Sequence, residues 1–76
     1  MYYVYFLESK RNGDLYVGST ENLEERVALH NEGRVRSTKA YRPWKLLGFE
    51  EYSSRNEAVK KEKFYKEHQQ KEILKK

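Results

Sequence analysis

The chain has 76 residues, and its length and composition exclude several classes of protein. A typical domain runs to about 100 residues, so residues 1–76 are expected to form one small domain with a limited core. Charged residues make up 37% of the chain, but 14% aromatic residues argue against disorder, because disordered segments are poor in aromatics. The absence of cysteine excludes a disulfide framework, a thiolate zinc site and a cysteine nucleophile.

Net charge and hydropathy indicate which partners and which cellular compartment to expect. Sixteen Lys and Arg against twelve Asp and Glu give a net charge of +4, which suits a polyanionic partner but is also common on ordinary surfaces. No apolar run approaches the ~18–20 residues of a membrane span, and the N-terminal MYYVYFLES lacks the charged start of a signal peptide. We therefore expect a cytoplasmic protein with no membrane partner.

The first part of the chain is typical of a β-hairpin. Residues 2–8 are dense in aromatic and β-branched residues, and residues 14–19 form a second strand-like run. The Asn-Gly pair at 12–13 is a strong signal for a two-residue turn. Such a turn would put odd positions of the first strand opposite even positions of the second, so that Tyr5 and Gly18 share a face. A glycine inside a strand also indicates either a bulge or the close approach of another group.

Two helices and a third strand follow. We expect a helix over about 22–32, a basic loop over 33–43, a strand over 44–52 and a helix from Ser54 to about 74. Asn22 and Glu25 form a capping box for the first helix, and Gly33 provides its stop. The order β-β-α-β-α predicts an α/β (α+β) domain with a three-stranded antiparallel sheet flanked by helices.

Three charged or titratable side chains fall on helix faces that should be apolar. Arg26 and His30 lie one turn apart against the apolar stripe of the first helix, and Glu62 lies near the middle of that of the second. The structural alternatives are a snorkelling Arg, a satisfied His and a boundary carboxylate with a basic neighbour. The functional interpretation is phosphate chemistry, because Arg matches a phosphate bidentately, His can relay a proton and a buried carboxylate must be paired or hold a metal.

Two strand tyrosines can be interpreted in two ways as well, and the basic loop is a candidate nucleic-acid contact. Tyr5 and Tyr16 are either half-buried strand residues or phenols that position a water molecule. The loop over 33–43 carries four cations that would contact a nucleic-acid backbone: Arg34, Arg36, Lys39 and Arg42.

Two tyrosine motifs and the residues that follow them are the basis for a family resemblance. The motifs are YVY at 3–5 and YVG at 16–18; Arg26 follows Tyr16 by 10 positions, His30 follows it by 14, and Glu62 stands four after Ala58. This pattern resembles the GIY-YIG endonuclease superfamily, in particular its small single-domain members, over essentially the whole chain.

The resemblance implies metal-assisted hydrolysis of DNA phosphodiester bonds with one Mg²⁺ or Mn²⁺ ion. Glu62 would hold the ion, Arg26 would clamp the phosphate, Tyr5 or Tyr16 would position and deprotonate the attacking water, and His30 would orient a tyrosine hydroxyl or relay its proton. One carboxylate is sufficient, because Mg²⁺ keeps several waters and takes further contacts from phosphate. We expect these groups to converge on one face of the sheet.

Departures from the family pattern leave other functions open. Tyr3 replaces the glycine of the first motif, and no Asn follows Asn56, although many family nucleases carry one there; Gln69 or Gln70 would have to substitute. The alternative is therefore a catalytically weak or inactive nucleic-acid-binding module of the same fold. A third class, a protein-interaction domain, would use exposed anchors at Tyr41, Trp44 and Phe64. With no room for a second domain, specificity would come from DNA shape, a homodimer or an accessory protein.

Overall fold

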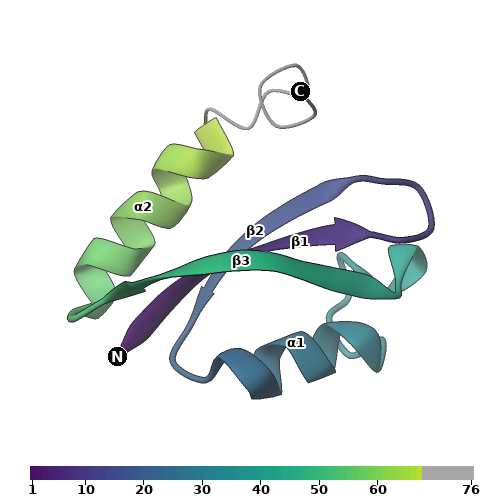
Figure 1. Cartoon of the computed structure of the whole chain (residues 1–76), viewed down its shortest axis with the longest axis horizontal. Coiled ribbons are helices and arrows are strands. Elements are labelled where there is room, and N and C mark those ends of the chain that lie inside the picture. Colours follow the sequence, from purple (N-terminus) through teal and green to yellow (C-terminus); the bar gives the residue numbers. More distant parts are fainter. Residues whose placement is uncertain (68–76) are drawn as a thin grey trace.

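The computed structural model describes residues 1–67 and has the predicted β-β-α-β-α order (Figure 1). The elements are β1 (Tyr2–Ser9), β2 (Leu15–Thr20), α1 (Leu23–Asn31), a short 3₁₀ helix η1 (Lys39–Tyr41), β3 (Trp44–Tyr52) and α2 (Arg55–Glu67). The strands form one antiparallel sheet in the order β2-β1-β3. The predicted α+β fold is therefore confirmed. The predicted extension of α2 to about 74 lies outside the described residues.

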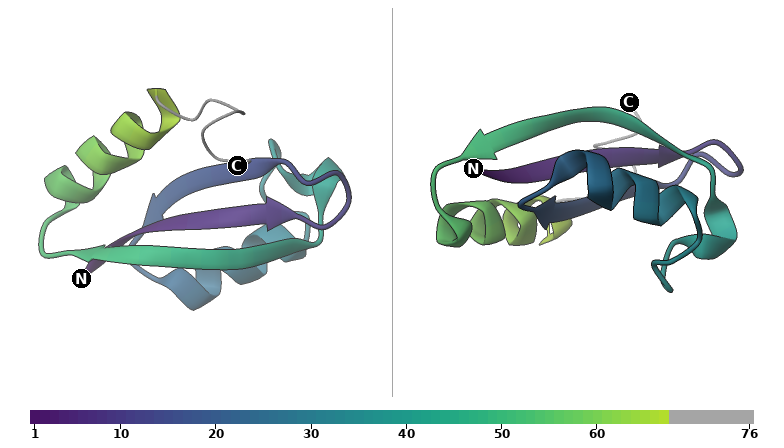
Figure 2. Two further views of the ribbon diagram at one scale, coloured as in Figure 1. Left: turned by 45° about the horizontal axis from the view of Figure 1, so that its top comes forward. Right: turned by 90° about the horizontal axis from the view of Figure 1, so that it is seen from below.

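The two helices cover opposite sides of the sheet. Figures 1 and 2 show α1 on one side and α2 on the other, with the three strands between them. Two small clusters fill the layers, because the side chains of a strand alternate between its faces. Val4 and Val17 pack against Ala58 of α2, whereas Tyr5, Leu7 and Trp44 form the core under α1. No helix within residues 1–67 is long and apolar enough to cross a membrane.

The hairpin has the predicted pairing of odd with even positions, but its turn is longer than expected and its register is shifted by two residues. Tyr5 lies opposite Gly18 and Leu7 lies opposite Tyr16, as the parity argument required. The backbone N–H of Ser9 donates to the carbonyl of Asp14 at 2.8 Å, so residues 10–13 form a four-residue loop rather than a two-residue turn. Four and two are both even, and the same side chains therefore stay on each face.

Helix α1 begins and ends where the sequence predicts. The side chain of Asn22 accepts the backbone N–H of Glu25 at 3.1 Å, which satisfies one of the free donors of the first turn. The reciprocal half of the capping box is replaced, because the N–H of Asn22 donates to Thr20 Oγ1. Gly33 has a φ of +78°, a left-handed conformation that ends the helix.

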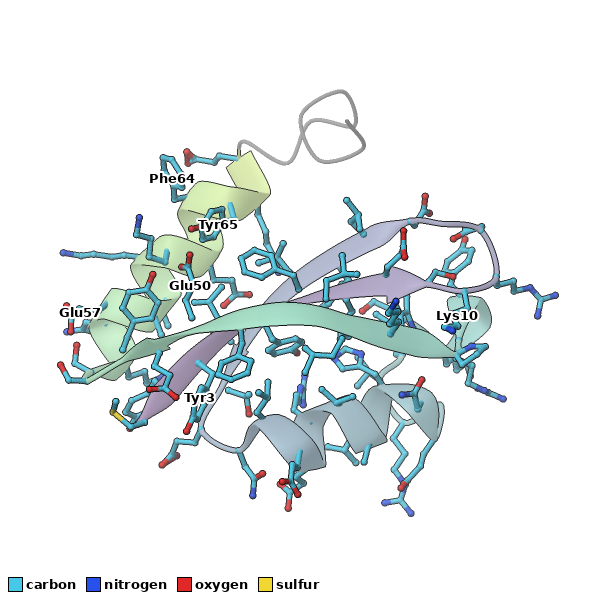
Figure 3. All side chains as sticks on the ribbon, in the orientation of Figure 1. Tyr3, Lys10, Glu50, Glu57, Phe64 and Tyr65 are labelled. Atoms are coloured by element: carbon cyan, nitrogen blue, oxygen red, sulfur yellow. The ribbon has the colours of Figure 1, made fainter. Side chains whose placement is uncertain are left out.

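Helix α2 is fixed to the sheet by a carboxylate on β3. Glu50 accepts hydrogen bonds from the hydroxyls of Tyr52, at 2.5 Å, and Tyr65, at 2.8 Å, and Figure 3 shows Glu50 and Tyr65 between the strand and the helix. At the N-terminus of α2, the Ser54 hydroxyl accepts the N–H of Glu57, which confirms the predicted cap. Glu62 lies between these two attachment points of α2, so they fix where its side chain meets the sheet.

One prediction about exposed aromatic anchors is wrong. Trp44 is only 6% exposed, because it packs in the α1-side core and its indole N–H donates to the carbonyl of Thr38 at 2.9 Å. Tyr41 and Phe64 are exposed, as that hypothesis required. The third class of function thus loses the largest of its three anchors.

Candidate active site

The close packing of Tyr5 against Gly18 lies at the centre of the candidate site. A β-carbon added to Gly18 would meet the hydroxyl oxygen of Tyr5, and it would lie 2.6 Å from the ring carbon that carries that hydroxyl. The strand glycine therefore marks a close approach and not a bulge. The irregularity in the sheet lies elsewhere, between Phe6 and Leu7 in the pairing of β1 with β3. Glycine at position 18 leaves the space that the hydroxyl end of the Tyr5 phenol occupies beside β2.

A buried chain of hydrogen bonds runs from Tyr5 into the basic loop. The Tyr5 hydroxyl lies 2.9 Å from His30 Nε2, and His30 Nδ1 lies 2.8 Å from Thr38 Oγ1. The Thr38 hydroxyl donates to the carbonyl of Val35, so it accepts the proton of Nδ1. Nε2 is then the acceptor, and Tyr5 donates to it. This arrangement holds His30 as the neutral imidazole.

Burial sets the protonation states of this chain. His30 is fully buried, and burial, with a further contribution from the nearby Arg26 charge, lowers its pKa to about 4. Burial also raises the pKa of Tyr5 to about 12, while the neighbouring Arg26 guanidinium acts in the opposite direction. At neutral pH the Tyr5–His30 pair is therefore uncharged.

Arg26 presents a charged and incompletely satisfied guanidinium. Its Nε is buried and has no hydrogen-bond partner, and it is the sole buried side-chain nitrogen or oxygen in this condition within residues 1–67. Its contact with the Tyr5 hydroxyl raises the pKa of Arg26, with smaller contributions from Tyr16 and Glu62. A buried donor without an acceptor is costly, so this geometry suits an anionic ligand that supplies one.

Tyr16 is the more accessible of the two motif tyrosines. Its ring packs edge-on against His30 at 5.0 Å between centroids and lies 6.3 Å from the ring of Tyr5. Tyr16 is half-buried, whereas Tyr5 is 1% exposed. Both phenols thus line one site, but Tyr16 is the one with a surface toward solvent.

Glu62 reaches the site from the other side of the sheet. Its Oε1 accepts the hydroxyl of Ser19 at 2.5 Å, and Ser19 alternates with Gly18, so its side chain faces α2. Its Oε2 forms an ion pair with Lys66 at 3.0 Å. The expectation that all the groups converge on one face therefore needs correction: Tyr5, Arg26 and His30 share the α1 face, and Glu62 approaches across β2. The structural alternative for Glu62, a boundary carboxylate paired with a basic neighbour, is also met, because Lys66 is that neighbour.

The oxygen atoms around Glu62 are of the kind that a hard cation prefers as ligands. The Glu62 carboxylate lines a pocket of about 500 Å³ whose polar walls also include Ser19, Thr20, Glu21 and Arg55. Carboxylate and hydroxyl oxygens, with space for water, suit Mg²⁺ or Mn²⁺. No group of three or more His, Cys, Asp or Glu that could enclose a metal occurs in the described part of the chain. The fit is therefore to an ion that keeps most of its waters.

The basic loop lies beside the site because Thr38 joins it to His30. The four predicted nucleic-acid contacts on this loop are all exposed: Arg34, Arg36, Lys39 and Arg42. Arg34 pairs with Glu32 at 3.3 Å, and both side chains are more than half exposed. An exposed pair of this kind is weak and leaves the arginine available to a phosphate.

Three contacts of the site are not evident from the sequence. Each of three residues contacts a predicted site residue: Thr38, Ser19 and Lys66. Their sequence contexts indicate only a loop, a strand and a solvent-exposed helix, in that order. Only Lys66 had a local signal, since it stands four residues after Glu62 on the same helix. The other two depend on contacts 8 and 43 residues apart in the sequence.

Comparisons with known proteins give one family model and several relatives. The family model described as the GIY-YIG catalytic domain matches residues 1–76. UPF0213 protein SH2523 of Staphylococcus haemolyticus is 44% identical over 62 residues, which cover 80% of this chain and 74% of that protein. UPF0213 proteins of Bacillus licheniformis (41% identical; 86% and 67% covered) and Clostridium perfringens (40% identical; 87% and 71% covered) are similar too. No solved structure gives a significant match.

Proposed function

Because the chain belongs to the GIY-YIG catalytic domain family, we propose that it is a metal-dependent endonuclease that hydrolyses phosphodiester bonds of DNA. One observation is the main support: the guanidinium of Arg26, with an unpartnered buried Nε, lies beside two tyrosines and within the electrostatic influence of Glu62. A phosphate needs such a donor, and a hydrolytic metal needs such a carboxylate.

Arg26 is assigned the role of the phosphate clamp. Its raised pKa keeps it fully charged, and its unpartnered Nε would donate to a non-bridging oxygen of a phosphate. Negative charge that develops on these oxygens in the transition state would strengthen their hydrogen bond with Arg26. An interaction that is stronger in the transition state than in the ground state is the condition for catalysis.

Tyr16 is the tyrosine that positions the attacking water. Tyr5 is unsuited to this role because it is buried, its pKa is raised to about 12 and its hydroxyl donates a hydrogen bond to His30. Tyr16 lies at the surface of the same cluster. His30 then acts as a positioning residue that orients Tyr5, and not as a proton relay, since Tyr5 and Thr38 occupy its two nitrogens.

Glu62 is the proposed holder of one divalent cation, Mg²⁺ or Mn²⁺. When bound, such an ion would supply electrostatic stabilisation of charge on the phosphate and the leaving oxygen. The basic loop would bind the DNA backbone next to the site, through the four cations named above. DNA shape, a second copy of the chain or an accessory protein would provide specificity.

A nicking assay on supercoiled plasmid and branched DNAs tests this function. We expect cleavage with Mg²⁺ or Mn²⁺ and none with EDTA, and losses of about 10²-fold or more in Glu62→Gln, Arg26→Ala and Tyr16→Phe. Lys63→Gln, an exposed change on α2, should retain full activity and serves as the matched control. Cleavage that survives Glu62→Gln would show that the metal ligand is wrongly assigned.

The second candidate is a nucleic-acid-binding module with little catalysis. The observation that favours it is the ion pair of Glu62 with Lys66, which gives the carboxylate a partner without any metal. Salt-sensitive DNA binding by the folded protein, without cleavage under any metal condition, would support this function instead.

A further inference from the structure

Lys66 occupies the one oxygen of Glu62 that Ser19 leaves open. Ser19 donates to Oε1, whereas the Lys66 ammonium lies 3.0 Å from Oε2. The side chain of Glu62 is 21% exposed and that of Lys66 is 47% exposed, so the pair lies at the surface and not inside the core. A cation is thus already present where the proposed function places a divalent ion.

The same ammonium contacts a second group of the site. Lys66 Nζ lies 5.4 Å from the centroid of the Tyr16 ring, within the range of a cation–π contact. Lys66 therefore bridges Glu62 of α2 and Tyr16 of β2. If it lost its bond to Oε2, it would keep a favourable position beside the tyrosine that is proposed to position water.

We propose that Lys66 is an internal competitor for the divalent cation, so that the Lys66–Glu62 ion pair and the metal exclude each other at Oε2. This inference rests on the proposed function. Two cations cannot share one carboxylate oxygen without strong repulsion, and the ammonium must move when the ion binds. A DNA phosphate would give the displaced ammonium a new anionic partner.

The consequence is that metal and DNA help each other to bind. Without DNA, the free energy needed to displace Lys66 weakens the affinity for the metal ion. With DNA bound, this free energy is smaller, because a phosphate pairs with the displaced ammonium. Coupling of this kind is reciprocal, so the metal would raise the affinity for DNA by the same factor. Lys66 is thus assigned as a positioning residue that limits metal occupancy until substrate is present.

A Mg²⁺ titration of the whole protein without DNA tests the competition. The amide NMR signals of Ser19 and Glu62 report binding even at millimolar affinity. Lys66→Met keeps the length of the aliphatic chain and removes the charge, and we expect its dissociation constant to fall about two- to five-fold, as for the loss of an exposed ion pair. Lys66→Arg keeps the charge and should bind Mg²⁺ like the original protein.

Lys63→Met is the matched control, because it removes the same charge from an exposed position of the same helix. It should leave the Mg²⁺ affinity unchanged. If Lys66→Met binds Mg²⁺ no more tightly than the original protein, while Glu62→Gln abolishes binding, the competition is disproved and the metal site stands. If Mg²⁺ binding is the same with and without the Glu62 carboxylate, the metal assignment and the competition both fail.

Discussion

At the scale of single residues, the site depends on the absence of one side chain. Gly18 is needed not for backbone freedom but for space, since the Tyr5 phenol lies where a β-carbon would be. The same strand pairing brings Tyr16 and Ser19 to the two faces of β2, one toward His30 and the other toward Glu62. Gly18 therefore permits both the packing of Tyr5 in the core and its hydrogen bond with His30 in the candidate site.

Gly18→Ala should be strongly destabilising. Both Gly18 and Tyr5 are buried, so the added methyl group must displace the phenol and break its bond to His30, at a cost of about 1–3 kcal/mol. Urea denaturation would measure the loss. Gly48→Ala is the matched control, because a β-carbon at Gly48 meets nothing within 4 Å. Equal stability of the two variants would contradict the steric explanation.

Protonation of His30 should make folding sensitive to acid. Its pKa is about 4 in the folded protein and ~6.5 when unfolded, so the unfolded chain binds the proton more tightly. The stabilisation is complete above pH 6.5 and is lost as the pH falls toward 4, by about 3 kcal/mol in all. Urea denaturation between pH 4 and 7 checks this.

The control for this acid sensitivity is His30→Gln, whose stability should lack that part of the pH dependence. The difference between the two curves isolates His30 from the carboxylates, which titrate in both proteins. Parallel curves for His30→Gln and the original protein would contradict the buried neutral histidine.

At the scale of elements, the basic loop is held by its two ends. Asn31, at the end of α1, accepts the N–H of Trp44 at 2.6 Å and donates to its carbonyl at 3.2 Å. Within the loop, Thr38 receives the Trp44 indole N–H on its carbonyl and the imidazole N–H of His30 on its hydroxyl. The loop is therefore built into the α1-side core.

Thr38→Val should loosen this attachment. The two side chains have nearly the same shape, but valine leaves the buried Nδ1–H of His30 without an acceptor, which costs about 1–3 kcal/mol. The free energy of unfolding, measured with urea, gives the loss. Thr38→Ser retains the hydroxyl and should stay closer to the original protein. A valine variant as stable as the serine variant would show that the bond contributes nothing.

Local signals predicted these elements with different success. Asn22 and Gly33 fixed the ends of α1, because capping depends on residues within one turn. The Asn-Gly pair at 12–13 did not give a two-residue turn. Ser9 instead binds the N–H groups of Arg11 and Asn12 and donates to the carbonyl of Tyr41, a contact 32 residues away.

At the scale of the whole molecule, charge should govern binding to DNA. The net charge is +4, and the exposed cations of the basic loop lie beside the site through the link from Thr38 to His30. When Lys and Arg side chains neutralise DNA phosphates, counterions are released, so the logarithm of the binding constant falls linearly with the logarithm of the salt concentration. We therefore expect DNA binding to weaken steeply between about 50 and 200 mM salt.

Removing two loop charges should reduce that salt dependence. For Arg34→Gln combined with Arg36→Gln, the slope should fall by roughly two units, since each phosphate contact contributes about one. Fluorescence anisotropy with a labelled duplex at several salt concentrations measures the slope. Lys60→Gln with Lys61→Gln on α2 has the same charge change and should leave the slope nearly unaltered. Binding that is independent of salt would refute the electrostatic interface.

By itself, the sequence determined the order of the elements, the faces of the hairpin and the family. Caps, strand periodicity and motif spacing are local or one-dimensional, so composition and position suffice to recover them. The tertiary structure decided which groups meet: that Tyr5 is buried on His30, that Glu62 comes from the opposite side of the sheet, and that Lys66 holds its free oxygen. These contacts depend on how α2 docks across β2, and no local pattern in the chain encodes that docking.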